Sequence, residues 1–328
     1  MYKSKLNLEE TEHAIKLVKD TFQLQLKSAL KLSRVTAPLF VDANQGINDN
    51  LNGYEIPISF TFDNDQKKCE IVHSLAKWKR QKLYKMNIKP GYGIYTDMNA
   101  IRTSEVLDDI HSLYVDQWDW EQVIDNNQRN KNYLYAVVND IYGALKRTEF
   151  IVCEQFSKLT PFLPDNIECM TSEKLAQKYP NKNAKEREYE ICKQYGAVFI
   201  SRIGGVIPGF SKPHDNRAPD YDDWNLNGDI LIWYPELKKP IELSSMGIRV
   251  NSESLKSQLE LSGNTRWSVY EYHKNILNNI YPLTIGGGIG QSRLCMMLLH
   301  KLHIGEVQSS VWTDEIIKQC KEKNIELL

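Results

Sequence analysis

The stretch that most constrains this chain is a run of glycines between an apolar segment and a helical pattern. In LTIGGGIGQSRLCMMLL, residues 283–299, four glycines fall within the five positions 286–290. The apolar start favours a strand, and Leu294, Met297 and Leu298 recur at helical spacing. Glycines have no Cβ atom, so a flat ligand can lie directly on their backbone. The run therefore predicts a strand, a glycine turn and a buried helix beside a ligand surface.

Arg293 lies in the first turn of that predicted helix, where side chains lean back toward the glycines. Its planar guanidinium can stack on an aromatic ring or meet a phosphate. The run matches neither of two common nucleotide motifs: the dinucleotide fingerprint needs glycine where Gln291 or Arg293 stands, and the chain has no Gly-Lys-Ser/Thr of a P-loop. The alternative is a close helix-on-strand crossing with a surface arginine.

Charge and composition exclude several classes of protein. The 328 residues carry 41 Lys and Arg against 42 Asp and Glu, so the chain lacks the positive charge that draws proteins to nucleic acid. No apolar run reaches the roughly 20 residues of a membrane span, and the start MYKSKLNLEE does not resemble a signal peptide. The six cysteines contain no C-x-x-C pair, which favours reduced packing residues. We expect a cytoplasmic protein that binds neither nucleic acid nor membrane.

Periodicity along the chain predicts one α+β domain over residues 1–328. Asn7 and Glu10 form a capping box before a long amphipathic helix that reaches about Leu30. Further strands are predicted over 34–40 (broken by a proline), 56–62, 69–72, 93–101, 111–120, 197–203, 229–234 and 241–250, and further helices over 128–158, up to Pro180, and over 183–196. With no repeat or linker, we expect a mainly antiparallel sheet with helices on one side.

Two strands present polar residues that need an explanation. Period-two geometry over 111–120 puts Gln117 and Asp119 on one face and Trp118 on the other. A buried amide and carboxylate need a ligand or partners, whereas an edge strand would leave Asp119 in water. Glu242 and Arg249 are seven apart, so a bulge at 245–247 is needed to bring them to one face.

Three other charged segments have an ordinary structural interpretation. Asp49, in the polar loop 42–53, is typical of turn chemistry. The three Lys and Arg residues of HSLAKWKRQ, residues 73–81, together with its histidine, are typical of a solvated basic helix. The charged run RAPDYDDW, residues 217–224, suggests either an ordered functional loop or an open acidic turn.

The glycine run ending in Arg293 resembles the third signature of class II aminoacyl-tRNA synthetases, whose arginine stacks on adenine. Aspartyl-tRNA synthetase-like sites present a serine and a lysine five apart, an arginine, a Gln-x-Asp strand, and a glutamate with an arginine seven later. This chain has the same order in Ser74, Lys79, Arg102, Gln117, Asp119, Glu242, Arg249 and Arg293. Joint agreement along nearly the whole chain favours a relationship over chance. The helix and proline-broken run before residue 40 resemble the first signature, which implies a homodimer.

The runs YVDQWDWE, RAPDYDDW and ELSSMGIRV look closely like the ammonia-dependent asparagine synthetases, which consist of this catalytic core alone. Before Pro38 there is no room for an anticodon-binding barrel, and the start Met1-Tyr2 lacks the cysteine of glutamine-dependent enzymes. The resemblance implies that L-aspartate, ATP and ammonia give L-asparagine, AMP and diphosphate through a β-aspartyl-adenylate. The rivals are another ligase on the same scaffold and an inactive synthetase paralogue.

The resemblance also implies roles for residues at the nucleotide end. Arg102 and a Mg²⁺ ion would offset charge on the phosphate, with Glu242 and Asp229 holding the metal. Arg293 would clamp the adenine, and Gly288 and Gly290 would complete the nucleotide surface.

At the amino-acid end, the resemblance implies that Gln117 and Asp119 hold the carbonyl and ammonium of the substrate. Its carboxylates would be held by Ser74, Lys79, Ser244, Ser245 and Arg249. Asp222 would contact substrate or ammonia. Asp49 would orient the substrate or take a proton from ammonium, so Asp49, Arg102 and Gln117 are the expected catalytic residues.

Overall fold

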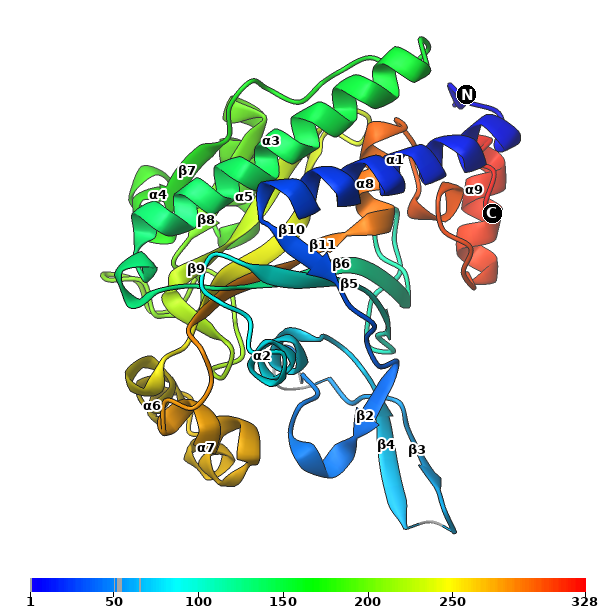
Figure 1. The fold of residues 1–328 in the computed structure, drawn as a ribbon. Coiled ribbons are helices and arrows are strands. Elements are labelled where there is room, and N and C mark those ends of the chain that lie inside the picture. Colours follow the sequence, from blue (N-terminus) through cyan, green and yellow to red (C-terminus); the bar gives the residue numbers. More distant parts are fainter. Residues whose placement is uncertain (1, 50, 52–54, 65) are drawn as a thin grey trace.

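An eight-stranded sheet forms the centre of the computed structural model, which describes residues 2–49, 51, 55–64 and 66–328 (Figure 1). Its strands are β1 (Leu32–Arg34), β5 (Gly93–Ile101), β6 (Tyr114–Val123), β7 (Glu168–Thr171), β8 (Ala197–Ser201), β9 (Asp222–Tyr234), β10 (Lys239–Arg249) and β11 (Thr284–Gly290). They lie in the order β1-β5-β6-β11-β10-β9-β8-β7. The outermost pair at each edge is parallel and the pairs between them are antiparallel. The mainly antiparallel α+β class is therefore confirmed, while the extent of a single domain stays a prediction.

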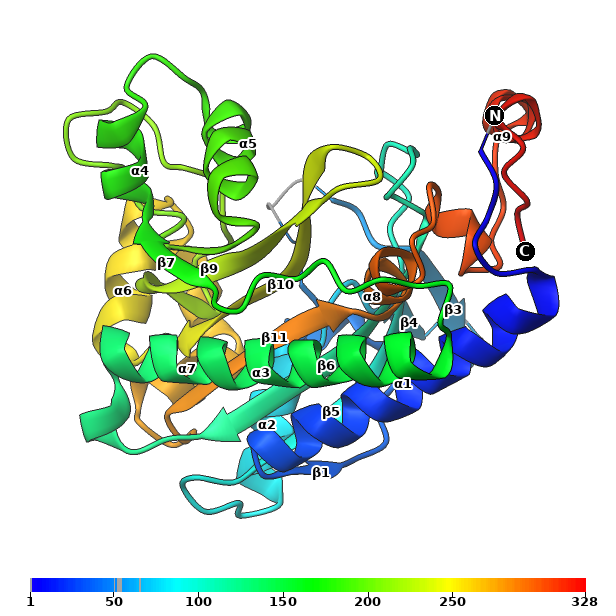
Figure 2. The same cartoon turned by 90° about the horizontal axis from the view of Figure 1, so that it is seen from above.

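Helices cover both faces of this sheet, so the expectation of helices on one side is wrong. The helices α1 (Leu8–Ala29) and α3 (Lys131–Gln155) lie side by side across one face, together with α8 (Gln291–Leu298) (Figures 1 and 2). On the other face lie α2 (Ala76–Lys85), α6 (Ser252–Leu261) and α7 (Glu271–Leu277) (Figure 1). The second layer is needed because that face carries charged side chains, which find their partners in α2 and its neighbours.

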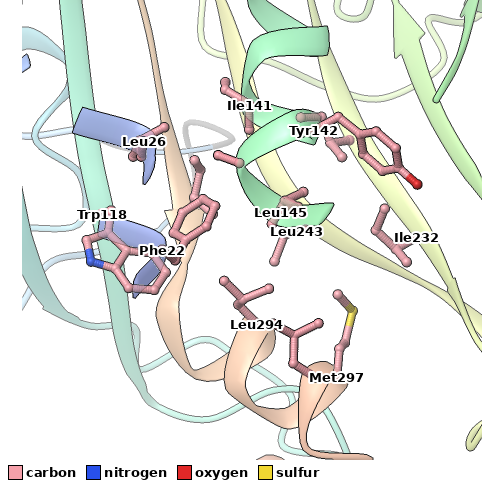
Figure 3. Close-up of a cluster of buried hydrophobic side chains, with 14 of the residues drawn as sticks. Phe22, Leu26, Trp118, Ile141, Tyr142, Leu145, Ile232, Leu243, Leu294 and Met297 are labelled. Atoms are coloured by element: carbon pink, nitrogen blue, oxygen red, sulfur yellow. The ribbon is translucent and has the colours of Figure 1, made fainter. Parts of the chain in front are cut away.

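The main apolar core lies between the sheet and α1, α3 and α8 (Figure 3). Phe22 of α1 packs against Trp118 of β6 with ring centroids 4.7 Å apart, and Trp120 is also fully buried there. Since side chains alternate along a strand, Gln117 and Asp119 point to the opposite face. A slip of one residue would exchange the tryptophans for these polar groups, so the core fixes the register of β6.

Local signals placed several helices well and some strands poorly, and they gave no sign of α6, α7 or the helix over residues 314–323. Both parts of the Asn7/Glu10 capping box form, and so do those of a second box at Asn183, which begins α5 (Ala184–Tyr195). The predicted strand 34–40 is wrong over most of its length: β1 ends at Arg34 and β2 begins at Phe40, because Pro38 has no N–H for a ladder. The strand predicted over 111–120 begins later, at Tyr114, and continues to Val123.

A three-stranded sheet lies beside the main one, in the order β2 (Phe40–Asp42), β4 (Lys67–Ile71), β3 (Ser59–Phe62). It stands below the sheet edge in Figure 1. The connection from β2 to β3 contains Asp49; of the predicted loop 42–53, residues 50, 52 and 53 lie outside the described residues. This small sheet therefore brings a loop carboxylate toward the polar face of the main sheet.

The remaining helices, α4 (Ser172–Lys178) and α9 (Asp314–Lys323), lie at the periphery. Near α9 the two ends of the chain meet, where the Asn324 side-chain amide donates to the carbonyl of Tyr2 at 3.1 Å. Within the described part of the chain, none of the helices combines the length and apolar character needed to cross a membrane.

Candidate active site

One cavity of about 300 Å³ gathers nearly all of the predicted site residues. They reach it from α2, the residue after β5, the middle of β6, the start of β9, and the strands β10 and β11. The cavity is lined by Asp49, Ser74, Lys79, Arg102, Gln117, Asp119, Asp222, Glu242, Ser244, Ser245, Arg249, Gly288, Gly290 and Arg293, among others. Of the predicted site residues, Asp229 is the one that does not line the cavity. It forms an ion pair with Arg217, which does.

The glycine run is a strand and not a turn, which corrects the sequence prediction. Residues 284–290 form β11 between β6 and β10, and the helix α8 follows directly. Side chains of both neighbouring strands cross over it: a Cβ on Gly288 would collide with Gln117, and one on Gly287 with Met246. The glycines are thus required by the strands beside them, and they also leave the backbone of Gly288 and Gly290 open to the cavity.

Two arginines line the part of the cavity where the sequence predicts a nucleotide. Arg102 follows β5 and donates from Nη2 to the carbonyl of His73 at 3.2 Å, while its buried Nε has no partner among the described residues. Arg293, in the first turn of α8, donates from Nη1 to the carbonyl of Glu242 at 2.8 Å. Counting partners among the described residues, both guanidinium groups keep N–H groups to spare in one shared space, where a phosphate and an aromatic ring can be bound.

Lys79 and Asp119 form an ion pair in the part of the cavity where the sequence predicts the amino acid. Asp119 is 2% exposed because β6 lies inside the sheet, so the edge-strand alternative is wrong. Burial lowers the pKa of Lys79 from its ordinary value, and Asp119 opposes that shift. The second oxygen of Asp119, Oδ2, is buried with no partner in the described chain, and so is Oγ of Ser244. An acceptor and a hydroxyl thus stand ready for a polar ligand.

Arg249 is held by two carboxylates, one of which sequence analysis missed. Its Nε and Nη2 donate to Glu121 at 3.0 and 2.7 Å, and Nη1 donates to Asp222. Glu121 also accepts from Thr284 Oγ1 at 2.7 Å. The signal for Glu121 was the alternation along β6, since it lies two residues beyond Asp119 on the same face.

The irregularities of β10 differ from the predicted bulge at 245–247. The pairing with β9 shifts between Glu242 and Ser244 and again between Gly247 and Arg249, while 245–247 stay regularly paired. The predicted bulge was invoked to bring Glu242 and Arg249 to one face, and both residues do line the cavity.

The helix that carries Lys79 is not a solvated basic helix. Lys77, Lys79 and Arg80 are all buried, and Arg80 donates to the carbonyls of Pro282 and Val250 at 3.0 and 2.8 Å. Ser74 stands just before this helix and accepts from the N–H of Ala76 at 3.1 Å. The predicted interpretation fails because the cations meet carboxylates and carbonyls that come from distant parts of the chain.

The charged run 217–224 is an ordered wall of the site and not an open turn. Asp220 is fully buried beside Lys77, Asp222 binds Arg249, and Arg217 forms a buried ion pair with Asp229. The sequence analysis gave Arg217 no role, because nothing in the sequence linked it to Asp229.

Glu242 and Asp229 are the candidate metal ligands. Burial and the like charge of Glu242 raise the pKa of Asp229 well above its ordinary value, although Arg217 opposes the shift. Asp229 Oδ1 is buried and, among the described residues, has no hydrogen-bond partner. The described residues contain no group of three or more His, Cys, Asp or Glu side chains that could hold a metal ion. Two carboxylates with a spare oxygen fit a Mg²⁺ ion, which in nucleotide sites is bound by one or two carboxylates and the phosphates.

Asp49 combines turn chemistry with a place in the cavity. Its Oδ1 accepts from the N–H of Leu51 at 2.9 Å, as expected for an aspartate in a turn, while Oδ2 is buried without a partner in the described structure. Burial raises the pKa of Asp49 to about 6, with Lys77 acting against the rise. A carboxylate of this kind is ionised at neutral pH and able to accept a proton.

Comparison with known proteins shows the family to which this chain belongs. A family model described as aspartate-ammonia ligase matches residues 9–324. The aspartate–ammonia ligase of Fusobacterium nucleatum is 53% identical over 327 residues, covering 100% of this chain and 99% of that protein. The aspartate–ammonia ligase of Bacillus cytotoxicus is also 53% identical over 327 residues, covering 100% of each chain.

Solved structures of two tRNA synthetases share the fold. Asparaginyl-tRNA synthetase from Pyrococcus horikoshii, complexed with asparaginyl-adenylate, superposes with a TM-score of 0.65 at 12% identity, covering 91% of this chain and 68% of that one. Aspartyl-tRNA synthetase from Entamoeba histolytica gives 0.59 at 14% identity, covering 91% and 58%. The predicted class II synthetase-like fold is thereby confirmed.

Proposed function

This chain belongs to the aspartate–ammonia ligase family, and we propose that it joins L-aspartate and ammonia into L-asparagine while cleaving ATP to AMP and diphosphate. The observation that carries the proposal is the shared cavity: the guanidinium groups of Arg102 and Arg293 open into the same space as Gln117 and Asp119. A nucleotide and an amino acid bound at these ends would meet.

Activation of the substrate is the first step we propose. A carboxylate is a poor acyl donor because its leaving group would be oxide, and transfer of AMP replaces that leaving group with a good one. A β-carboxylate oxygen of aspartate attacks the α-phosphorus, the bond from that phosphorus to diphosphate breaks, and β-aspartyl-adenylate remains. Charge builds on the phosphate oxygens during attack. Arg102 and Arg293 both line the cavity, where Arg102 would stabilise that charge and Arg293 would hold the adenine.

We propose Mg²⁺ as the metal that accompanies ATP, with Glu242 and Asp229 as its carboxylate ligands. The ion would supply further neutralisation of phosphate charge when bound. Glu242 lines the cavity, and Asp229 offers its Oδ1, which has no hydrogen-bond partner among the residues that the structure describes. Arg217 holds the other oxygen of Asp229 and so fixes the orientation of that carboxylate.

The ion pairs at the other end would orient aspartate. Asp119 Oδ2, which has no partner in the described part of the chain, would accept from the substrate ammonium, with Gln117 on the same strand. Lys79 and Arg249 supply positive charge for the substrate carboxylates, and Ser74, Ser244 and Ser245 line the same region as donors. Asp222 borders the cavity while binding Arg249, so it can contact either substrate or ammonium.

Amide formation is the second step. Ammonium must lose a proton before its nitrogen can attack, and Asp49 is placed to take that proton through Oδ2. The nitrogen lone pair then forms a bond to the acyl carbon, the bond from that carbon to AMP breaks, and the new amide releases a second proton to solvent. Asp49 and Arg102 thus act at successive steps, one on the nitrogen and one on the phosphate.

The pH dependence of amide formation tests the role of Asp49. With its pKa raised to about 6 by burial, its carboxylate is protonated at pH 5 and ionised at pH 7. At a fixed total concentration of ammonium, we expect the rate of asparagine formation to rise from pH 5 and to level off above pH 7. If the enzyme used only ammonia formed in solution, the rate would instead keep rising tenfold per pH unit to pH 8.

We further propose a cytoplasmic homodimer that does not bind nucleic acid. The near-neutral charge of −1 supports the last point. Apolar side chains exposed on and next to the small sheet, Leu39, Phe40, Phe60 and Phe62, form the kind of surface that a second subunit would cover. Phe40 and Phe60 are in edge-to-face contact there, 5.1 Å apart.

A direct assay decides between this function and its rivals. With aspartate and MgATP alone, we expect aspartate-dependent exchange of diphosphate into ATP; asparagine and AMP should accumulate only when ammonium is added. Exchange supported better by another amino acid would identify a different ligase on this scaffold. Absence of both activities in the folded protein would instead favour an inactive synthetase paralogue.

A further inference from the structure

Three buried ionisable residues, Lys77, Asp220 and His273, connect α2 to α7. The proposed mechanism does not use them. Nζ of Lys77 lies 2.6 Å from Oδ2 of Asp220, and Nε2 of His273 lies 2.9 Å from the same oxygen. These residues are 6%, 0% and 1% exposed. None of them lines the cavity, so the group has no direct access to a substrate bound there.

The same lysine holds the loop that carries Asp49. Lys77 Nζ donates to the backbone carbonyls of Gly46 and Asn48 at 3.4 and 3.2 Å. The Asn48 amide donates to the carbonyl of Ile71 at 3.1 Å, and its oxygen accepts from the N–H of His73 at 3.0 Å. Residues 46–48 are therefore fixed from the side of α2 and from the end of β4.

Trp267 and Tyr270, which precede α7, also lie against this loop and Lys77. Gly46 has a φ of +65°, and a Cβ there would lie 2.9 Å from Cγ of Tyr270. The Lys77 ammonium lies 5.8 Å from the centre of the Trp267 ring. His273 is also in ring contact with Tyr270, 5.9 Å apart. Trp267 and Tyr270 thus contact both the group of Lys77, Asp220 and His273 and the loop that carries Asp49.

Stability does not explain why charges are kept in this place. Desolvation of a buried ion pair usually offsets its Coulombic attraction, so apolar residues of similar size would serve the fold equally well. Burial acts to raise the pKa of Asp220, but Lys77 and His273 hold it at about 2, so this carboxylate stays ionised. The charge of Lys77 also limits the rise in the pKa of Asp49. The lysine therefore acts on both the position and the charge of Asp49.

We propose that Lys77, Asp220 and His273 are positioning residues that hold Asp49 for the amide-forming step and are not needed for adenylation. This inference rests on the proposed function. Adenylation depends on Arg102, Arg293 and the aspartate-binding residues. Of these, Arg102 meets the loop only indirectly, through His73, whose N–H donates to Asn48 and whose carbonyl accepts from Arg102. Asp49 directly follows the residues that Lys77 anchors, and a displacement of about 1 Å can cost as much as 10²-fold in rate.

The test separates the two half-reactions in the double variant Lys77→Met/Asp220→Asn, which removes both charges so that neither is left buried alone. We expect aspartate-dependent exchange of diphosphate into ATP, without ammonium, to stay within about threefold of the wild type. The kcat/KM for ammonium in asparagine formation should fall at least about tenfold. With hydroxylamine, which is largely neutral at pH 7 and needs no base, the loss should be smaller.

Lys301→Met is the matched control. Lys301 is 3% exposed and donates to Ser4 and Thr11 at 2.7 and 2.8 Å, on the far side of the sheet. Its replacement should lower stability without changing the ratio of the two half-reactions. If the double variant does not fold, His273→Leu and His273→Gln replace it: the leucine variant should show the same selective loss to a lesser degree, and glutamine, which keeps an N–H for Asp220, should restore amide formation.

Two results would overturn the inference: an equal loss in both half-reactions, or no loss in amide formation. Neither is confused with failure of the proposed function, because in that case the wild-type protein itself would form no asparagine from ammonium.

Discussion

Replacing Arg102 by alanine should lower kcat/KM for asparagine formation by about 10³-fold while the protein still folds. Within the described part of the chain, the guanidinium makes one hydrogen bond, to the carbonyl of His73 at 3.2 Å, and its Nε has no partner. Little native structure therefore depends on it, whereas the charge that develops on the α-phosphate would lose its nearest cation. Steady-state kinetics and circular dichroism would measure the two effects.

Arg147→Ala provides the comparison for that variant. Arg147 is an exposed arginine of α3 that donates to Gln25 at 2.9 Å, on the face of the sheet that α1 and α3 cover. It should keep wild-type kinetics. Arg102→Lys should remain strongly impaired, because an ammonium cannot reproduce the planar fork of a guanidinium. Normal turnover in Arg102→Ala would contradict the assignment of this arginine to the phosphate.

The parts of the site that sequence could predict are those carried by a single strand or a short motif. The tryptophans at 118 and 120 must enter the core, so alternation alone directs Gln117 and Asp119 to the other face. Arg293 follows the glycine run closely enough for helical geometry to aim it. The capping boxes at Asn7 and Asn183 are local as well, and both form. In each case the deciding contact lies within a few residues.

The parts that sequence could not predict depend on which strands become neighbours. Sequence shows that Gly288 lacks a side chain, but only the pairing of β11 with β6 shows that Gln117 occupies the space. The cations of α2 looked solvated because their partners are distant: Arg80 and the carbonyl of Pro282, for example, are 202 positions apart. Asp220 and Lys77 are recognisable as a pair only after the sheet has assembled. Burial of a charge is thus a tertiary property that residue type and spacing do not encode.

Glu121→Gln should weaken both the fold and the binding of aspartate, because it removes one of the two charges that hold Arg249. Breaking a buried ion pair by removing one partner costs about 3–5 kcal/mol of unfolding free energy, and both Glu121 and Arg249 are buried. Without the forked contact to Glu121, the arginine would turn toward Asp222 and away from the substrate carboxylate. The KM for aspartate should rise at least about tenfold, with the KM for ATP little changed.

Glu149→Gln separates loss of stability from loss of binding. Glu149 is a buried glutamate of α3 that accepts from the N–H groups of Phe162 and Leu163 at 2.7 and 2.9 Å, away from the cavity. Its replacement should lower the free energy of unfolding in urea and leave the KM for aspartate unchanged. If both variants changed that KM equally, general loosening of the fold would explain the Glu121 result.

Acid unfolding gives an independent measure of the Glu121 ion pair. Burial acts to raise the pKa of Glu121, but Arg249 lowers it below the ordinary value of 4.5. A carboxyl with a lowered folded-state pKa contributes its full stability above its unfolded pKa and loses it as the pH falls through the folded-state value. The wild-type protein should therefore lose stability below pH 4.5 more steeply than Glu121→Gln. Parallel curves would mean that the pair does not stabilise the fold, and Arg249 would then owe its orientation to Asp222 alone.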